Sequence, residues 1–281
     1  MQVNPVAEEA ADGQVRENYR RLKIALNSAS LPAFFTYLGA FQEYLDYLTG
    51  QLTDNLEDGR FKTIASELSN EFVTKIGSVL KKSDRLEEWL TINKQNPSFY
   101  NFQRDLQSII LINVKLACIF VALREAVKGW AVAAKQLPRS AGATSPAAQE
   151  FKNDEFISEY ILKETVSPDV ASNSALAVGS HAITGSGNSL ARNLLPEYLR
   201  LCDSDLNSYM KKDYFWVLRV QLEEKILSVL STFPHLIFSP YNVMIEYTQK
   251  YANFYELLYF LYEKFPTLAM QRLIFSAYMH F

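Results

Sequence analysis

The spacing of apolar residues restricts the fold of this chain more than any other feature, because it follows the period of an α-helix. The first run follows an Asp12-Gly13 start signal and comprises Val15, Tyr19, Leu22 and Leu26. The next run predicts one further helix, with apolar positions at Leu38, Phe41, Leu45, Leu48 and Leu52. Further helices are predicted over 66–82, 84–94 and 102–127. No convincing run alternates apolar and polar residues, so the sequence predicts an all-α protein.

The composition changes near Pro138, where small residues, glycine and proline replace the helical period as far as about Ser189. We therefore predict a first helical repeat over 1–135, a connection over 136–192 and a second, shorter repeat over 193–281. An offset of 180 residues pairs Leu38 with Leu218, and a later offset of 152 pairs Phe102 with Phe254. The second repeat then lacks about 28 residues (180 − 152), which correspond to 61–97 of the first.

Two such repeats predict a body with a pseudo-two-fold axis, joined by a long linker. Each half has an apolar face to bury against the other half. The interface between the halves is a natural place for a pocket, because ligand sites in helical proteins lie between helices.

Composition excludes several classes of protein. Of the 281 residues 48% are hydrophobic, and the net charge of −3 gives no reason to expect a nucleic-acid partner. Cys118 and Cys202 form no CxxC pair, which indicates buried free thiols in a reducing compartment. The apolar stretch 109–123 contains Asn113 and Lys115 and is short for a membrane span. With no signal-peptide pattern at the N-terminus, we expect a cytoplasmic protein without a membrane partner.

No metal or cofactor is predicted. The three histidines are isolated from one another, and no HExxH, GxSxG or glycine-rich phosphate loop is present. Acid–base chemistry would therefore use carboxylates. Asp213 is the most prominent candidate, in the stretch MKKDYFWVLRV, where it precedes an apolar helix. It is either the N-cap of that helix or a general base beside aromatic residues, whose burial would raise its pKa.

Three stretches give the chain a resemblance to a known family: VRENYRRLKIAL at 15–26, LPAFFTYLGAFQEYL at 31–45 and INVKLACIFVALRE at 112–125. Together with the two degenerate copies, they make the chain similar to the group I 2-haloacid dehalogenases. That resemblance implies an all-α protein of two repeats with the active site between them. The apolar positions of the family's repeat are matched by Phe35, Leu38, Phe41 and Leu45, whereas Gln42 stands where proline is common.

The resemblance also implies a reaction. Family members hydrolyse the carbon–halogen bond of small 2-haloalkanoic acids: an aspartate in the second repeat activates a water molecule, which attacks C2 with inversion. Asp213, immediately before Tyr214, is the matching candidate. Asn113 matches a position that lines the pocket, where it would hold the water; otherwise it is a buried amide bonded to a neighbouring helix. No cofactor is implied.

The substrate would need a cation and an apolar wall. Arg219 or Lys115 would hold the carboxylate, unless both are ordinary surface charges. The aromatic wall would suit the halide and the short alkyl chain, unless its members are core residues; the candidates are Phe34, Tyr37, Tyr214 and Trp216.

A second hypothesis keeps the fold without the catalysis. The chain would then bind a small carboxylate, an apolar ligand or a protein partner, and the departures at Gln42 and 212–215 favour this. A peroxidase of the related helical superfamily would need a CxxC pair, which is absent. The sequence leaves open whether two chains form a homodimer.

Overall fold

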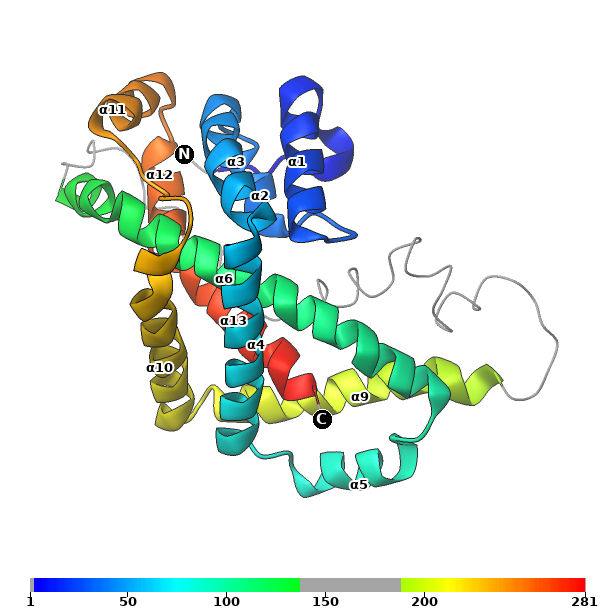
Figure 1. Ribbon diagram of the computed structural model, residues 1–281. Helices are drawn as coiled ribbons and strands as arrows, with labels where there is room; N and C mark the ends of the chain where they lie inside the picture. The colour runs from blue at the N-terminus through cyan, green and yellow to red at the C-terminus, as the bar shows by residue number, and fades with distance from the viewer. Residues whose placement is uncertain (1–2, 137–187, 281) are drawn as a thin grey trace, which may run out of the picture.

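The computed structural model describes residues 3–136 and 188–280, with side chains as far as 130 and again from 194. Every regular element in these ranges is helical, which confirms the all-α prediction for the described part of the chain (Figure 1). Most of the predicted connection over 136–192 lies outside the described residues.

The first part of the chain forms six α-helices after a short 3₁₀ turn at Glu8–Ala10. They are α1 (Gly13–Leu26), α2 (Ala33–Leu38), α3 (Gln42–Glu57), α4 (Gly59–Val79), α5 (Asp84–Asn93) and α6 (Pro97–Gln136). The single helix predicted from Leu38 to Leu52 is wrong, because the chain breaks between α2 and α3. At the break Phe41 leaves helical geometry with φ −126° and ψ 66°, and its carbonyl oxygen then accepts the first hydrogen bond of α3, from Leu45.

The second part of the chain, from 188 to 279, is also built from helices. Its elements are α9 (Asn188–Tyr209), α10 (Asp213–Val229), a 3₁₀ turn (Leu230–Thr232), α11 (Tyr241–Lys250), α12 (Phe254–Tyr259), a π-helical turn η4 (Phe260–Lys264) and α13 (Phe265–Met279). Thus α11 lies between Phe233 and Asn253, where the sequence comparison had placed a gap relative to the first part.

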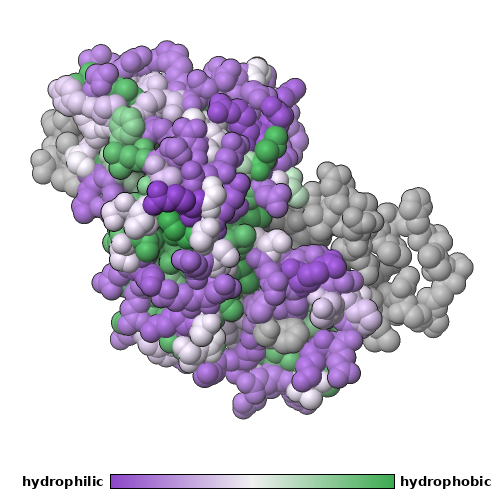
Figure 2. Space-filling model, viewed as in Figure 1, coloured by the Kyte–Doolittle hydropathy of each residue, from purple (hydrophilic) through white to green (hydrophobic). Residues whose placement is uncertain are grey.

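The centre of the molecule is the pair α6 and α13, which cross in the middle of Figure 1 and make the most extensive helix–helix contact described. Every residue of α13 except Thr267 is buried. By length and composition, the part of α6 from Pro97 to Trp130 could cross a membrane: its most apolar 18-residue window has a mean hydropathy of 2.2. Yet 78% of that window is buried inside the molecule. Such burial is also found in core helices of globular proteins. The face seen in Figure 2 is mostly hydrophilic, with small hydrophobic patches.

Aromatic side chains link the two parts of the chain in a reciprocal way. Tyr44 on α3 packs edge-on against Phe254 on α12, with ring centroids 5.0 Å apart. Tyr198 on α9 packs edge-on against Phe102 on α6, at 6.0 Å, and its ring lies tilted against that of Trp89 on α5, at 5.1 Å. Each part therefore places a buried tyrosine among aromatic residues of the other part, so neither core is complete by itself.

The C-terminal end of α13 is held by side chains from elsewhere in the fold. The carbonyl oxygen of Met279 accepts hydrogen bonds from Gln103 Nε2, at 3.0 Å, and from the hydroxyl of Tyr198. Lys82 Nζ donates to the carbonyl oxygens of Tyr278 and His280. These donors satisfy carbonyl groups that the end of a helix leaves without partners within the helix.

Candidate functional site

Asp213 is the first residue of α10 and its side chain is exposed. The N-cap position is Lys212, whose carbonyl oxygen accepts from the amide of Phe215 at 3.1 Å. The N-cap interpretation of Asp213 is therefore wrong by one residue. A carboxylate in the first turn still interacts favourably with the partial positive charge of the helix start. A catalytic role for Asp213 required its side chain to be buried beside aromatic residues, and the structure does not show such burial.

Asn113 is fully buried between α6 and α13. Its Nδ2 donates to Ser276 Oγ at 3.0 Å, and its Oδ1 accepts from Arg272 Nε at 2.6 Å. The interpretation of Asn113 as a buried amide bonded to a neighbouring helix is confirmed. Its partner Arg272 is also fully buried. A charged guanidinium is expensive to bury, so its hydrogen bond to Asn113 is an important contact of the central helix pair.

Phe34 and Tyr37 lie on α2, where the helix packs against the central pair. The ring of Phe34 is 4.6 Å from that of Phe120 on α6 and 5.4 Å from that of Phe265 on α13. Tyr37 packs edge-on against Phe265 at 5.9 Å and against Phe260 at 5.6 Å. The structure thus brings these two predicted residues together in one aromatic cluster. Phe34 is fully buried within it and Tyr37 is half-buried.

Arg219 belongs to an ion-pair network that joins three helices. Its Nη2 donates to Glu223 Oε2 at 2.9 Å and to Thr267 Oγ1 of α13 at 3.3 Å. Glu223 also forms an ion pair with Arg124 of α6, which pairs in turn with Glu125. Lys128 also pairs with Glu125, so two arginines and one lysine surround two carboxylates here. Glu223 and Thr267 thus bond Nη2 of Arg219, whereas its Nε is buried without a hydrogen bond to any described residue.

Tyr214 lies on the outer side of α10 and is 40% exposed. Its ring contacts that of Tyr209 at 5.9 Å, and the ammonium of Lys212 lies over both rings. Tyr214 and Asp213 therefore share one end of α10, whereas the aromatic cluster of α2 is built around the central helices. These contacts do not unite the predicted residues in a single site.

Lys115 is the most unusual charged residue on the central helix α6. The residue as a whole is 5% exposed, its Nζ is not one of the fully buried unpaired atoms, and no hydrogen bond or ion pair joins it to any residue in the described ranges. Burial lowers the pKa of its ammonium group below the usual value, and the positive charge of Lys62 on α4 lowers it further. A buried ammonium group with a second cation nearby is suited to receiving an anion.

The two cysteines offer little redox chemistry. Both are free and buried, and burial raises the pKa of each thiol to about 12. Neither is a thiolate near neutral pH, so neither has the reactivity of a peroxidatic cysteine. In the part of the chain that the structure describes, no cluster of three or more histidine, cysteine or acidic residues could hold a metal ion.

Sequence reasoning named Lys115 and Asn113 but missed Arg272. The signal for Arg272 was present, because it is the one charged residue in the run FPTLAMQRLIFSAYM, which forms α13. A lone charge in such an apolar helix indicates a buried and bonded group.

No family model, no curated protein and no solved structure matches this chain.

Proposed function

We propose that this chain is a two-repeat helical protein that binds a small carboxylate, with Lys115 as the cation that receives the carboxylate group. The observation that carries the proposal is the burial of Lys115 without a described hydrogen-bond or ion-pair partner. Partial burial disfavours the charged form of Lys115, and an anionic ligand at the ammonium group would stabilise that form. The two buried free thiols accord with action in the cytoplasm.

The order of the helices supports the two-repeat part of the proposal. Tyr198 follows Tyr44 by 154 positions (198 − 44), and the same offset pairs Phe61 with Phe215. All four residues are buried. At this offset α3, α4, α5 and α6 correspond in order to α9, α10, α11 and the α12–α13 segment. The reciprocal packing of Tyr44 and Tyr198 is what a pseudo-two-fold axis would produce.

The same register favours binding over catalysis. At an offset of 154, the Phe35–Leu38 motif corresponds to 189–192 rather than to the start of α10. The resemblance requires an aspartate just before that motif in the second repeat. The residues that stand there are Gly187 and Asn188. An asparagine can hold a water molecule but cannot take its proton, so the register supports a member of this group that binds without hydrolysing.

Binding is tested with propionate and 2-chloropropionate, with uncharged propionamide as the matched ligand. We expect both carboxylates to raise the thermal midpoint of the wild type and propionamide to leave it unchanged. At a ligand concentration of about 100 times Kd the gain is about 2.7 kcal/mol. Lys115→Met should abolish the effect, whereas Lys128→Met, an exposed lysine on the same helix, should retain it. Equal stabilisation of Lys115→Met and wild type would disprove the role of Lys115.

Hydrolytic dehalogenation of 2-haloalkanoic acids is the second candidate, and the resemblance of the sequence is what favours it. It is tested by chloride release from racemic 2-chloropropionate, with wild type and Asp213→Asn side by side. Release from the wild type that vanishes in a folded Asp213→Asn variant would make Asp213 the base. Binding without chloride release, which we expect, would leave the chain as a carboxylate-binding protein.

A further inference from the structure

Two pairs of consecutive lysines meet at one end of the molecule. Lys81-Lys82 follows the end of α4, and Lys211-Lys212 lies in the turn between α9 and α10. Figure 1 shows α4 and α9 ending, and α10 beginning, at this end. The hydroxyl of Tyr209 donates to the carbonyl oxygen of Lys81, so the two segments are in direct contact. Lysines that are 130 positions apart in sequence (211 − 81) therefore form one cluster of positive charge.

Tyrosine rings lie between these lysines. The ammonium of Lys82 lies 5.4 Å from the ring of Tyr278, and that of Lys212 lies 5.3 Å from the ring of Tyr209 and 5.8 Å from that of Tyr214. The ring of Tyr209 in turn contacts those of Tyr278 and Tyr214, at 6.0 and 5.9 Å. Cation–π contacts of this kind position the ammonium groups without neutralising their charge.

The exposed lysines at this end have no ionic partner among the described residues. Lys75 lies one helical turn beyond Glu71, whose ion pair with Lys225 marks the side of α4 that meets α10. In the part of the chain that the structure describes, no ion pair involves the exposed lysines of this end, which are Lys75, Lys81, Lys211 and Lys212.

Fewer carboxylates than lysines lie near this cluster. Asp205 accepts a hydrogen bond from the hydroxyl of Tyr278 at 2.6 Å. Asp84 and Glu87 belong to α5, which leads away from α10 in Figure 1. On the side of α10, Asp213 is the only acid among residues 213–220. This end of the molecule is therefore locally positive, although the whole chain has a net charge of −3.

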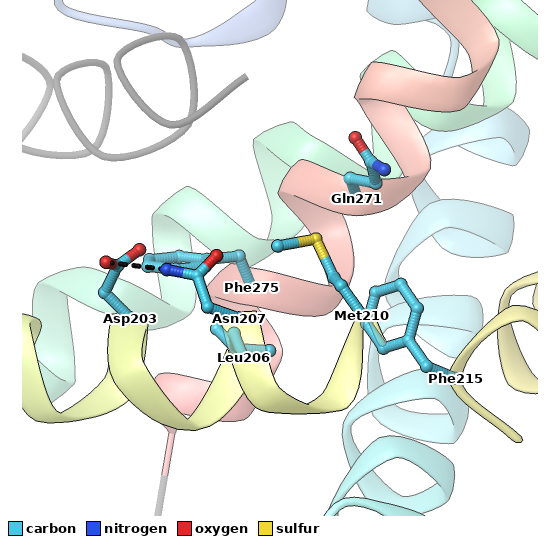
Figure 3. A pocket seen from close by; sticks show the side chains of 7 residues that line it. All are labelled: Asp203, Leu206, Asn207, Met210, Phe215, Gln271 and Phe275. Carbon is cyan, nitrogen blue, oxygen red and sulfur yellow. Dashed lines mark hydrogen bonds between the residues drawn. The ribbon is translucent and has the colours of Figure 1, made fainter. Parts of the chain in front are cut away.

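The first two turns of α10 expose an apolar surface beside the lysines. Phe215 anchors the buried side of the helix, where its ring lies beside Met210 at a small pocket between α9 and α13 (Figure 3). Its neighbours are exposed, at 40% for Tyr214, 39% for Trp216, 55% for Val217 and 45% for Val220. The indole Nε1 of Trp216 already donates to the carbonyl oxygen of Met210 at 2.9 Å, so its ring can leave water without losing a hydrogen bond.

We propose that this end of the molecule binds the surface of a bilayer that contains anionic lipids. The lysine ammonium groups contact the lipid headgroups. Tyr214 and Trp216 lie at the level of the headgroups, where such amphipathic rings gather, and Val217 and Val220 reach the start of the hydrocarbon. The proposal departs from the expected absence of a membrane partner, because the net charge of the whole chain conceals how its charges are distributed.

The valines favour a bilayer over a nucleic acid. Nucleic acids bind lysines through phosphates and aromatic rings through stacked bases, but they offer aliphatic side chains little. A bilayer accommodates all three kinds of side chain. Nor does the surface depend on the proposed carboxylate binding, because Lys115 lies on the central helix α6 and is not part of it.

The test is sedimentation of the protein with phosphatidylcholine vesicles, with and without phosphatidylserine. We expect binding to be at least tenfold tighter with phosphatidylserine. A rise in salt from about 0.1 to 1 M should release most of the bound protein, because it shortens the Debye length from about 10 Å to about 3 Å.

Charge variants locate the surface. Lys211→Gln with Lys212→Gln should weaken binding at least tenfold. Lys62→Gln with Lys94→Gln is the matched control, since it makes the same change in net charge at exposed lysines near the start of α4 and the end of α5, and it should bind as the wild type does. Lys115→Met should also bind as the wild type does, which separates this surface from the carboxylate site.

A fluorophore tests the orientation. Because Cys118 and Cys202 are buried, a cysteine introduced by Val217→Cys can be labelled selectively with a polarity-sensitive dye. Its emission should shift to the blue on vesicles that contain phosphatidylserine, whereas the same dye on Thr63→Cys, an exposed site near the start of α4, should not respond.

Equal binding to the two kinds of vesicle would overturn the proposal, as would wild-type binding by the variant that lacks Lys211 and Lys212. A dye at position 217 that stays in water on bound vesicles would overturn the proposed orientation. Binding of a single-stranded oligonucleotide without binding to vesicles would identify a nucleic-acid surface instead.

Discussion

Gly39 lies where no larger residue fits without a shift of its neighbour. A Cβ atom at this position would be 1.8 Å from the hydroxyl oxygen of Tyr19, which itself donates to the carbonyl oxygen of Val6 at 2.9 Å. The hydroxyl therefore links the segment before α1 to the turn after α2. This close approach explains why glycine stands at the break between α2 and α3.

We predict that Gly39→Ala lowers the free energy of unfolding by about 2 kcal/mol, because the new methyl group displaces the Tyr19 hydroxyl. Tyr19→Phe should cost about 1 kcal/mol for the lost hydrogen bond. The double variant should cost less than the sum of the two, since removal of the hydroxyl relieves most of the clash. Urea unfolding of the four proteins measures this coupling, and additive costs would contradict the steric explanation.

Lys115 makes a pH-dependent prediction. Its pKa in the fold is lower than in the unfolded chain, so the charged form destabilises the fold and this penalty disappears as pH rises from the lowered pKa to about 10.5. Lys115→Met should therefore be more stable than the wild type at pH 7 without ligand. The advantage should shrink as pH rises toward 10.5. Unfolding of both proteins from pH 7 to 10.5 measures the difference, in which other titrating groups cancel; a constant difference would contradict it.

For single residues, the sequence indicated which polar side chains stand out in apolar helices but not which residues they bond to. The pattern INVKLACIFVAL marks Asn113 and Lys115 as polar residues in an apolar helix, and both are buried. It could not reveal that Asn113 accepts a hydrogen bond from Arg272, 159 positions away. Nor could it reveal that Arg219 donates a hydrogen bond to Glu223. Such pairings depend on how α6, α10 and α13 cross, which the local pattern does not encode.

Helix boundaries divide into those that local signals determine and those that tertiary contacts determine. The start of α5 is local, since Ser83 caps it through a hydrogen bond from the amide of Leu86. The end of α1 is local as well, because Asn27 takes the left-handed conformation that asparagine tolerates. The break after Leu38 is not, because the apolar period continues across it. At this point the packing of Tyr19 against Gly39 ends the helix, although the helical spacing of apolar residues continues.

The end of α13 gives a prediction for one element. Tyr198→Phe removes one of two side-chain donors to the carbonyl oxygen of Met279 while keeping the ring in its aromatic cluster. We expect a loss of about 1 kcal/mol and faster amide hydrogen exchange in the last turn of α13. Tyr209→Phe is the control, because its hydroxyl bonds the carbonyl oxygen of Lys81 at an exposed site. Equal exchange in the wild type and Tyr198→Phe would show that Gln103 suffices.

For the whole molecule, the all-α class followed from the sequence but the register between the two parts did not. Apolar residues recur every three or four positions in both parts of the chain, so the two parts can be aligned at several offsets. Offsets of 180 and 154 both align many leucines. If the two parts are repeats, as we propose, the helix contacts favour the offset of 154. Tyr44 and Tyr198, which the offset of 154 pairs, each pack among aromatic residues of the other part.

This reciprocal packing predicts one cooperative unfolding transition. Trp89 packs against Tyr198 of the other part, and Trp216 lies on α10. Variants that keep only one of these tryptophans, with phenylalanine at the other tryptophan positions, should show the same urea midpoint after correction for their differing stabilities. Calorimetry of the wild type should give equal calorimetric and van't Hoff enthalpies. Two separate transitions would show that the parts fold independently.

The pairing of α6 with α13 also has a consequence for synthesis. Asn113 and its partner Ser276 lie 163 positions apart, so a ribosome adding about 5–20 residues per second needs roughly 10–30 s between them. During that interval the apolar face of nascent α6 lacks the helix that covers it. Because the most apolar 18-residue window of α6 has a mean hydropathy of 2.2, uncovered α6 would attract other nascent chains or a membrane. We therefore expect a chaperone to hold the emerging chain until α13 follows, and depletion of chaperones to lower the soluble yield.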